Sequence, residues 1–253
     1  MPANPCLVDG KPFDRGALPD GLFVAANIRT AGVRPLDTDL HAEVLDRASR
    51  EVLGLRCSTD PRELADSIGG LLRTNGYPDD GLSFVTVRRY LSGSVVVAAN
   101  GLFPYRERRL RMIFPQAGIA DFGIPFSEYR SSMSEAAFEM ARVELGRWNS
   151  AVKSVVRRTA EGDIVEIDGA PLFIVEGGRV VSPQRRTMSA EFGVAAEAVR
   201  RAGFGLVTER IDTERLLAAE ELFFADHRGI TAVSGCSGHI YMHLVAERVA
   251  DFY

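Results

Sequence analysis

Apolar and polar positions recur with two different periods along the chain, and the first 100 residues already contain both. Residues 40–53 show a helical period, because Val44, Leu45, Ala48 and Val52 fall on one stripe of a helix. A second helix is expected to start at Asp60-Pro61-Arg62-Glu63, because Asp60 is a good cap and Pro61 fits the first turn. Apolar runs rich in Val, Phe and Ala predict strands at residues 22–29, 82–90 and 94–99.

The second half repeats this mixture with shorter elements. Helices are expected at residues 134–145, at 213–219, from Ser189 to Gly203, and in an amphipathic tail at 239–251. Predicted strands are residues 151–157, 163–167, 172–175, 205–209, 221–225 and 230–233. The segment between these halves is rich in Pro and Gly and has little periodicity, which is typical of a linker.

The pattern as a whole predicts an α+β protein made of two units with mixed sheets. We place a smaller N-terminal α/β domain at residues 1–114, an interdomain linker at 115–133, and a larger C-terminal α/β domain at 134–253. The 253 residues, 46% of them hydrophobic, are enough for two modest cores.

Composition excludes several classes of function. A net charge of −4 provides no electrostatic reason to bind nucleic acid or an anionic membrane. No apolar run reaches the length of about 18 residues that a membrane helix needs, and the N-terminus is unlike a signal peptide. Three widely spaced cysteines without a CxxC motif predict neither a disulfide framework nor a metal site, and favour a reduced, cytoplasmic protein.

Lysine is almost absent, and this limits the possible chemistry. Of the 30 basic residues only Lys11 and Lys153 are lysines, so any reaction that needs a lysine amine has two candidates.

Residues 162–184, GDIVEIDGAPLFIVEGGRVVSPQ, carry a pattern with a known counterpart. Gly162, Glu166 and Phe173, followed by Ser182-Pro183, have the spacing of a Gly, a Glu, a Phe and a Thr-Pro in the class IV aminotransferase family. The segments at 216–233 (LLAAEELFFADHRGITAV) and 37–48 (DTDLHAEVLDRA) are similar to two further parts of that family. The chain thus resembles the fold-type IV pyridoxal-phosphate (PLP) enzymes, such as branched-chain aminotransferase and aminodeoxychorismate lyase. The resemblance implies a two-domain fold, a pocket between the domains and a homodimer.

The same resemblance shows where the cofactor site departs from the family. Counting back from Glu166 to the family's lysine leads to residues 130–134, where Met133 is the best match and no lysine occurs. The phosphate-binding turns correspond to residues 190–192 and 225–227, which bring in Glu191 and Asp226. An acid at that place opposes a dianionic phosphate. Glu166 keeps the family's residue type, which there pairs with the pyridine nitrogen, although a strand Glu that faces water or an Arg remains an alternative.

We therefore expect no cofactor, with PLP as the alternative. If PLP is used, Lys153 is the candidate for the Schiff base, although it lies thirteen residues before Glu166 on a strand that holds no such group in the family. His239 and His243 make only a weak pair of metal ligands, and we expect no metal.

Acid–base residues replace the lost cofactor residues in our interpretation. Asp226 next to His227 offers an acid/base pair together with Glu166, and Arg228 can hold a carboxylate. A polar surface loop is the alternative for this segment. Arg109, Arg111 and Tyr105 are expected to bind substrate from the first domain, unless they form a solvated sheet face or dimer salt bridges.

Three classes of function remain open from the sequence. The first is an enzyme that works without PLP on a small carboxylated metabolite in specialised metabolism, by lyase, cyclisation, dehydration or isomerisation chemistry. The second is a PLP-dependent enzyme with a displaced lysine. The third is a non-catalytic relative that binds a ligand. We expect a homodimer that uses the tail helix and the Arg-rich strands, and the substrate and reaction type are not determined.

Overall fold

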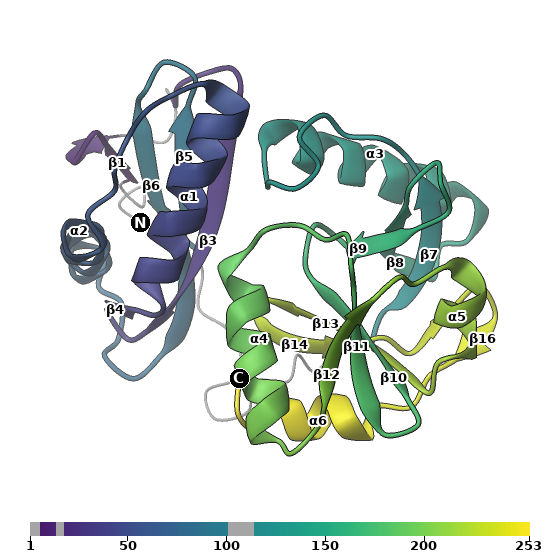
Figure 1. Ribbon diagram of the computed structural model, residues 1–253. Helices are drawn as coiled ribbons and strands as arrows, with labels where there is room; N and C mark the ends of the chain where they lie inside the picture. The colour runs from purple at the N-terminus through teal and green to yellow at the C-terminus, as the bar shows by residue number, and fades with distance from the viewer. Residues whose placement is uncertain (1–5, 14–17, 101–113) are drawn as a thin grey trace. The chain divides into compact units, whose positions relative to one another are not determined.

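The computed structural model describes residues 6–13, 18–100 and 114–253, which form two compact units (Figure 1). Unit 1 holds the described residues up to Asn100 together with Tyr129–Ser132, and unit 2 holds 114–128 and Met133–Tyr253. Both units combine helices with β-sheet, so the predicted α+β class is confirmed. No helix in the described part of the chain is long and apolar enough to cross a membrane.

Unit 1 is built on one antiparallel sheet. Its described strands pair in the order β2-β1-β6-β5-β3-β4. Their bounds are β1 Cys6–Val8, β2 Lys11–Phe13, β3 Phe23–Ala31, β4 Arg34–Pro35, β5 Leu82–Tyr90 and β6 Val95–Ala99. The predicted hairpin at Ser92-Gly93 joins β5 to β6, and the amide of Gly93 donates to the carbonyl of Tyr90.

Two helices belong to unit 1, and their sequence signals act as expected. Helix α1 (Thr38–Leu53) buries an alanine- and leucine-rich stripe and packs on β3 and β5. Helix α2 (Pro61–Thr74) begins after Asp60, whose carboxylate accepts hydrogen bonds from the amides of Arg62 and Glu63 at 2.7 and 3.4 Å. The predicted cap at Asp60 is confirmed, because it satisfies two amides that lack a partner inside the helix.

Unit 2 contains two five-stranded sheets. The first has the order β12-β11-β10-β13-β14, with bounds β10 Leu172–Glu176, β11 Arg179–Pro183, β12 Leu206–Glu209, β13 Glu221–Asp226 and β14 Gly229–Ala232. The second has the order β16-β15-β7-β8-β9, with bounds β7 Gln116–Asp121, β8 Val152–Arg158, β9 Ile164–Ile167, β15 Gly235–Cys236 and β16 His239–Ile240. The helices are α3 Ser132–Trp148, α4 Ala190–Arg201, α5 Thr213–Ala218 and α6 Leu244–Ala250.

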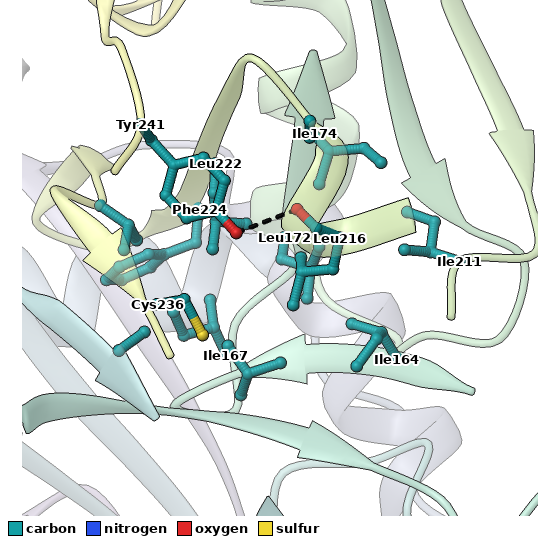
Figure 2. Close-up of a cluster of buried hydrophobic side chains, with 14 of the residues drawn as sticks. Ile164, Ile167, Leu172, Ile174, Ile211, Leu216, Leu222, Phe224, Cys236 and Tyr241 are labelled. Atoms are coloured by element: carbon teal, nitrogen blue, oxygen red, sulfur yellow. Dashed lines mark hydrogen bonds between the residues drawn. The ribbon is translucent and has the colours of Figure 1, made fainter. Parts of the chain in front are cut away.

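The first sheet of unit 2 is buried on both faces. Along β10, Phe173 and Val175 face a core shared with α4 and α6, while Leu172 and Ile174 face the core shown in Figure 2. In that second core the hydroxyl of Tyr241 donates to the carbonyl of Leu216 at 2.9 Å, and burial raises the pKa of the phenol. Burial on both faces explains why these strands are continuous apolar runs in the sequence.

The segment we interpreted as an aperiodic linker contains a central strand. Strand β7 lies between β8 and β15 and pairs with both in parallel. Its residues are small because the space is tight: a Cβ at Gly118 would lie 3.0 Å from a methyl of Leu145. A strand of Ala and Gly lacks the β-branched signal on which our prediction relied.

The tail also differs from the prediction of one helix at 239–251, which is wrong. His239 lies in β16, and α6 begins only at Leu244. The buried carboxylate of Glu221 accepts hydrogen bonds from the amides of Val245 and Ala246, at 2.9 and 3.0 Å, and so defines where the helix begins. His239 and His243 therefore do not share a helix face.

Candidate functional site

Glu166 lies in a buried ion pair. Strands β8 and β9 pair antiparallel with Arg157 opposite Glu166, and both side chains are almost fully buried, with exposed fractions of 3% and 2%. The Nε of Arg157 donates to Oε1 of Glu166 at 2.5 Å, and the hydroxyl of Thr187 donates to Oε2. Burial raises the pKa of Glu166, while Arg157 and Thr187 stabilise its charged form. Each carboxylate oxygen therefore has a donor from this chain, which matches our alternative of an Arg partner.

The start of α3 is where the resemblance places a lysine. The hydroxyl oxygen of Ser132 accepts a hydrogen bond from the amide of Phe23 at 3.4 Å, and Ser131 forms a β-bridge with Val24. Met133 packs against a small core that contains Phe138 and Val155. Hydroxyl and thioether groups occupy this helix start.

Neither lysine lies at this helix start. Lys153 is exposed on β8, and its Nζ donates to the carbonyl of Ser150 at 2.9 Å. It stands four residues from Arg157 along the strand, a separation of about 13 Å. Lys11 is exposed on the edge strand β2 of unit 1.

The start of α4 corresponds to one phosphate-binding turn of the resemblance. Ser189 accepts a hydrogen bond from the amide of Phe192 at 3.3 Å, as predicted for a cap. The ring of Phe192 stacks on Phe173 with centroids 6.0 Å apart, and the guanidinium of Arg186 lies 3.9 Å from the Phe192 centroid. Burial lowers the pKa of Arg186. This helix start carries an aromatic ring, a partly buried cation and the carboxylate of Glu191 in its first turn.

The Asp226-His227-Arg228 segment forms the turn between β13 and β14. Oδ1 of Asp226 accepts the amide of Arg228 at 2.7 Å, and Oδ2 accepts Nε and Nη2 of Arg228 at 2.9 and 2.5 Å. Asp226 and His227 are buried, whereas the side chain of Arg228 is 35% exposed. The turn is therefore not the solvated loop of our alternative interpretation.

Electrostatics keep Asp226 ionised. Burial alone would raise its pKa, but the positive charges of His227 and Arg228 and the hydrogen bonds from Arg228 lower the pKa below its usual value. The hydroxyl of Tyr253 also donates to the carbonyl of Asp226 at 3.1 Å. Acid–base chemistry by Asp226 and His227 stays a prediction.

The other predicted residues are distributed as follows. Arg109, Arg111 and Tyr105 lie outside the described residues. Within the described parts of the chain, Glu166 is joined to Arg157 and Thr187, and Asp226 to Arg228, while no described hydrogen bond links the two groups. A common cavity for Glu166 and His227 stays a prediction. Over the same described residues, no group of three or more His, Cys, Asp or Glu side chains is placed to hold a metal ion.

Sequence reasoning missed Arg157 and Thr187, although a signal existed for the first. Arg157 directly follows the buried Val155 and Val156 in β8, and the turn that follows sets Glu166 opposite it. Arg89 in unit 1 is likewise a buried arginine, with its guanidinium 2.9 Å from Asp46 and 2.8 Å from the hydroxyl of Thr59.

Comparisons with known proteins identify the fold. No protein-family model and no curated protein matches the chain. Among solved structures, a branched-chain aminotransferase from Thermoproteus uzoniensis with norvaline aligns with a TM-score of 0.83 at 20% identity, over 98% of this chain and 92% of that one. The branched-chain amino acid aminotransferase from Escherichia coli gives a TM-score of 0.79 at 16% identity, over 98% of this chain and 92% of that one.

A third solved structure with a similar fold is named for a different activity. A putative 4-amino-4-deoxychorismate lyase from Legionella pneumophila aligns with a TM-score of 0.72 at 13% identity, over 90% of this chain and 88% of that one. Identities this low establish the fold and leave the activity open. The chain thus has the two-domain α+β fold of the class IV aminotransferases, as its resemblance in sequence predicted.

Proposed function

We propose that this chain uses the class IV aminotransferase fold for a reaction that does not employ PLP. In this proposal its substrate is a small carboxylated metabolite, and acid–base groups carry out a lyase, cyclisation, dehydration or isomerisation step, none of which needs an electron sink. The observation that carries the proposal is the buried pair of Glu166 and Arg157, which uses the carboxylate internally.

The described residues do not fit PLP. A PLP enzyme needs a lysine amine for the Schiff base and a partner for the pyridine nitrogen. The helix start at 131–134 has no amine, and Lys153 is exposed and lies four strand residues from Arg157. Arg157 places a positive charge against Glu166, the carboxylate that would have to pair with a protonated pyridine nitrogen. Glu191 in the first turn of α4 further disfavours a phosphate dianion there.

The turn at 226–228 supplies the acid–base groups in this proposal. His227, the buried neighbour of the ionised Asp226, acts as general acid or base in this proposal. Arg228 is the partly exposed member of the turn, which supports its assignment to a substrate carboxylate. A branched-chain amino acid aminotransferase of this fold has a crystal structure in complex with 4-methylvaleric acid, a small carboxylic acid of this kind.

A non-catalytic ligand-binding relative is the second candidate. The observation that favours it is side-chain packing at positions corresponding to the family's cofactor site, where Met133 joins one core and Phe192 stacks on Phe173. A PLP enzyme that uses Lys153 is the third, and the exposure of Lys153 speaks against it.

The cofactor test is spectroscopic. We expect the purified protein to be colourless and to stay so when PLP is added, and we expect borohydride to attach no pyridoxyl group at Lys153. Lys153→Ala is the matched control and should give the same spectrum. A yellow protein whose colour disappears in Lys153→Ala would refute PLP independence.

The substrate test uses a panel of small carboxylates, followed by thermal shift and by mass spectrometry of the products. His227→Ala should abolish turnover while binding persists, and Arg228→Ala should mainly weaken binding. Lys153→Ala should change neither. Binding without turnover in the wild-type protein would favour the non-catalytic candidate, and full turnover in His227→Ala would refute the assigned base.

A further inference from the structure

Arg186 is a half-buried arginine in the loop between β11 and α4, and it makes no ion pair with the residues that the structure describes. The other described arginines of unit 2 that are not exposed each pair with a carboxylate: Arg142, Arg157, Arg158, Arg215 and Arg228. Burial without a counter-charge lowers the pKa of Arg186. A cation held in this way favours an anionic ligand, because removing a charge from water is costly unless the charge is paired.

An aromatic stack holds the guanidinium of Arg186 in place. Its central carbon lies 3.9 Å from the centroid of the Phe192 ring. Phe192 stacks on Phe173, and Phe173 stacks on Phe223, with ring centroids 6.0 and 5.2 Å apart and planes inclined by 7° and 17°. Phe173 and Phe223 are fully buried, so the stack begins in the core of unit 2. It covers one face of the guanidinium, whereas a carboxylate binds at the edge, where the N–H donors lie.

Most donors of Arg186 have no hydrogen-bond partner among the described residues. Its Nη1 donates to the carbonyl of Pro183 at 3.4 Å, which is long for such a bond. A guanidinium carries five N–H donors in one plane, and a carboxylate accepts two of them in parallel. The remaining donors of Arg186 are therefore sufficient for both oxygens of one carboxylate.

The residues that follow Arg186 fix the loop. The hydroxyl of Thr187 donates to the buried carboxylate of Glu166, and the amide of Met188 donates to the carbonyl of Glu128 at 2.6 Å. The backbone beside Arg186 is thus tied to two separate segments of unit 2. A guanidinium presented by a fixed backbone and a fixed ring loses little freedom when it binds an anion.

The local charges favour a carboxylate over a phosphate. Arg186 supplies one positive charge, and Glu191 in the first turn of α4 places a negative charge in the same segment. One guanidinium balances the single charge of a carboxylate. A phosphate dianion would keep a negative charge that Glu191 opposes.

We propose that Arg186 binds a carboxylate of the ligand through two parallel N–H···O bonds, at the end of this aromatic stack. The inference rests on the proposed function for the kind of ligand, a small carboxylated metabolite. It adds a binding residue to Arg228, whose Nε and Nη2 already donate to Asp226. Binding at Arg186 requires no turnover, so it is tested separately from the reaction.

Calorimetric titration of the full chain with acetate, succinate and 4-methylvalerate measures carboxylate binding. Arg186→Gln should weaken binding about tenfold or more, because it removes hydrogen bonds between charged groups. Arg186→Lys keeps the charge without the planar donors and should lose part of the affinity. The matched control is Arg201→Gln, which removes an exposed arginine 5.3 Å from the Phe252 ring and should bind as the wild type does. The uncharged 4-methylvaleramide should not bind.

A second measurement uses only the wild-type protein and so does not depend on the folding of a variant. Phenylglyoxal modifies accessible guanidinium groups, and mass spectrometry of peptides locates the label. A bound carboxylate should protect Arg186 and leave the labelling of Arg201 unchanged. Equal labelling of Arg186 with and without the carboxylates would overturn the proposal.

Three binding results would also overturn it. These are a wild-type protein that binds none of the three carboxylates at millimolar concentration, a folded Arg186→Gln that binds them as tightly as the wild type, and inorganic phosphate that binds more tightly than any of them. Carboxylate binding at Arg186 without product formation would support this inference and count against the proposed reaction. Turnover with an unchanged KM in Arg186→Gln would support the reaction and refute the role of Arg186.

Discussion

Replacing Arg157 by methionine tests whether Glu166 is a buried, internally paired carboxylate. The two side chains are 3% and 2% exposed, with Nε and Oε1 2.5 Å apart. Methionine keeps much of the volume of Arg157 and removes its charge and donors. Breaking a buried pair in this way leaves an uncompensated charge and costs about 3–5 kcal/mol. For a protein of this size that corresponds to a fall in Tm of roughly 6–20 °C.

The neighbouring residue provides a matched control. Arg158 pairs with Asp121 at 2.6 Å, but those side chains are 34% and 57% exposed. A solvent-exposed pair contributes about 0–1 kcal/mol, so Arg158→Met should lower Tm by less than about 4 °C. Both variants are measured by thermal and urea unfolding at pH 7, where the free energy of unfolding is compared with that of the wild-type protein.

The pH dependence of Arg157→Met has a defined sign. Burial raises the pKa of Glu166 above its ordinary value of 4.5, and loss of Arg157 removes the main opposing charge. The folded variant then binds a proton more readily than the unfolded chain, so its destabilisation should shrink as the pH falls from 7 toward 4.5.

The second variant in this series removes both partners. Arg157→Met/Glu166→Leu should recover most of the lost stability, because apolar side chains can replace a buried ion pair. If Arg157→Met costs no more than Arg158→Met at pH 7, Glu166 is solvated in the folded protein and the reasoning is refuted.

Two further predictions concern a helix cap and acid stability. Ser189→Ala removes the oxygen that accepts the hydrogen bond from the amide of Phe192, and should lower the free energy of unfolding by about 1 kcal/mol. Ser189→Thr keeps such an oxygen and should lower it by less. Urea unfolding measures both, and equal losses would exclude capping as the cause. Desolvation opposes ionisation of Asp46 and Asp226, but hydrogen bonds and nearby cations lower both pKa values below 3.8. The stability that these two ionised carboxylates contribute is present above pH 3.8 and is lost as the pH falls through their lowered pKa values. In Asp46→Asn the free energy of unfolding should therefore fall less steeply at acid pH than in the wild-type protein.

The sequence by itself determined features that depend on neighbours along the chain. The caps at Asp60 and Ser189, the hairpin at Ser92-Gly93 and most strands of unit 2 follow from local spacing, because caps and turns involve residues a few positions apart. The pattern around Glu166 also led to the correct fold, which solved structures share with this chain at low identity.

Tertiary structure decided which partner each polar group has. Strand β7 is recognisable only beside β8 and β15, because buried Ala and Gly carry no strand signal of their own. The start of α6 depends on Glu221, more than twenty residues earlier in the chain. Arg157 is a buried partner of Glu166 only because β8 and β9 pair in that register. Such pairings depend on strand register and long-range packing, and a single sequence records them only as residue types whose partners are unknown.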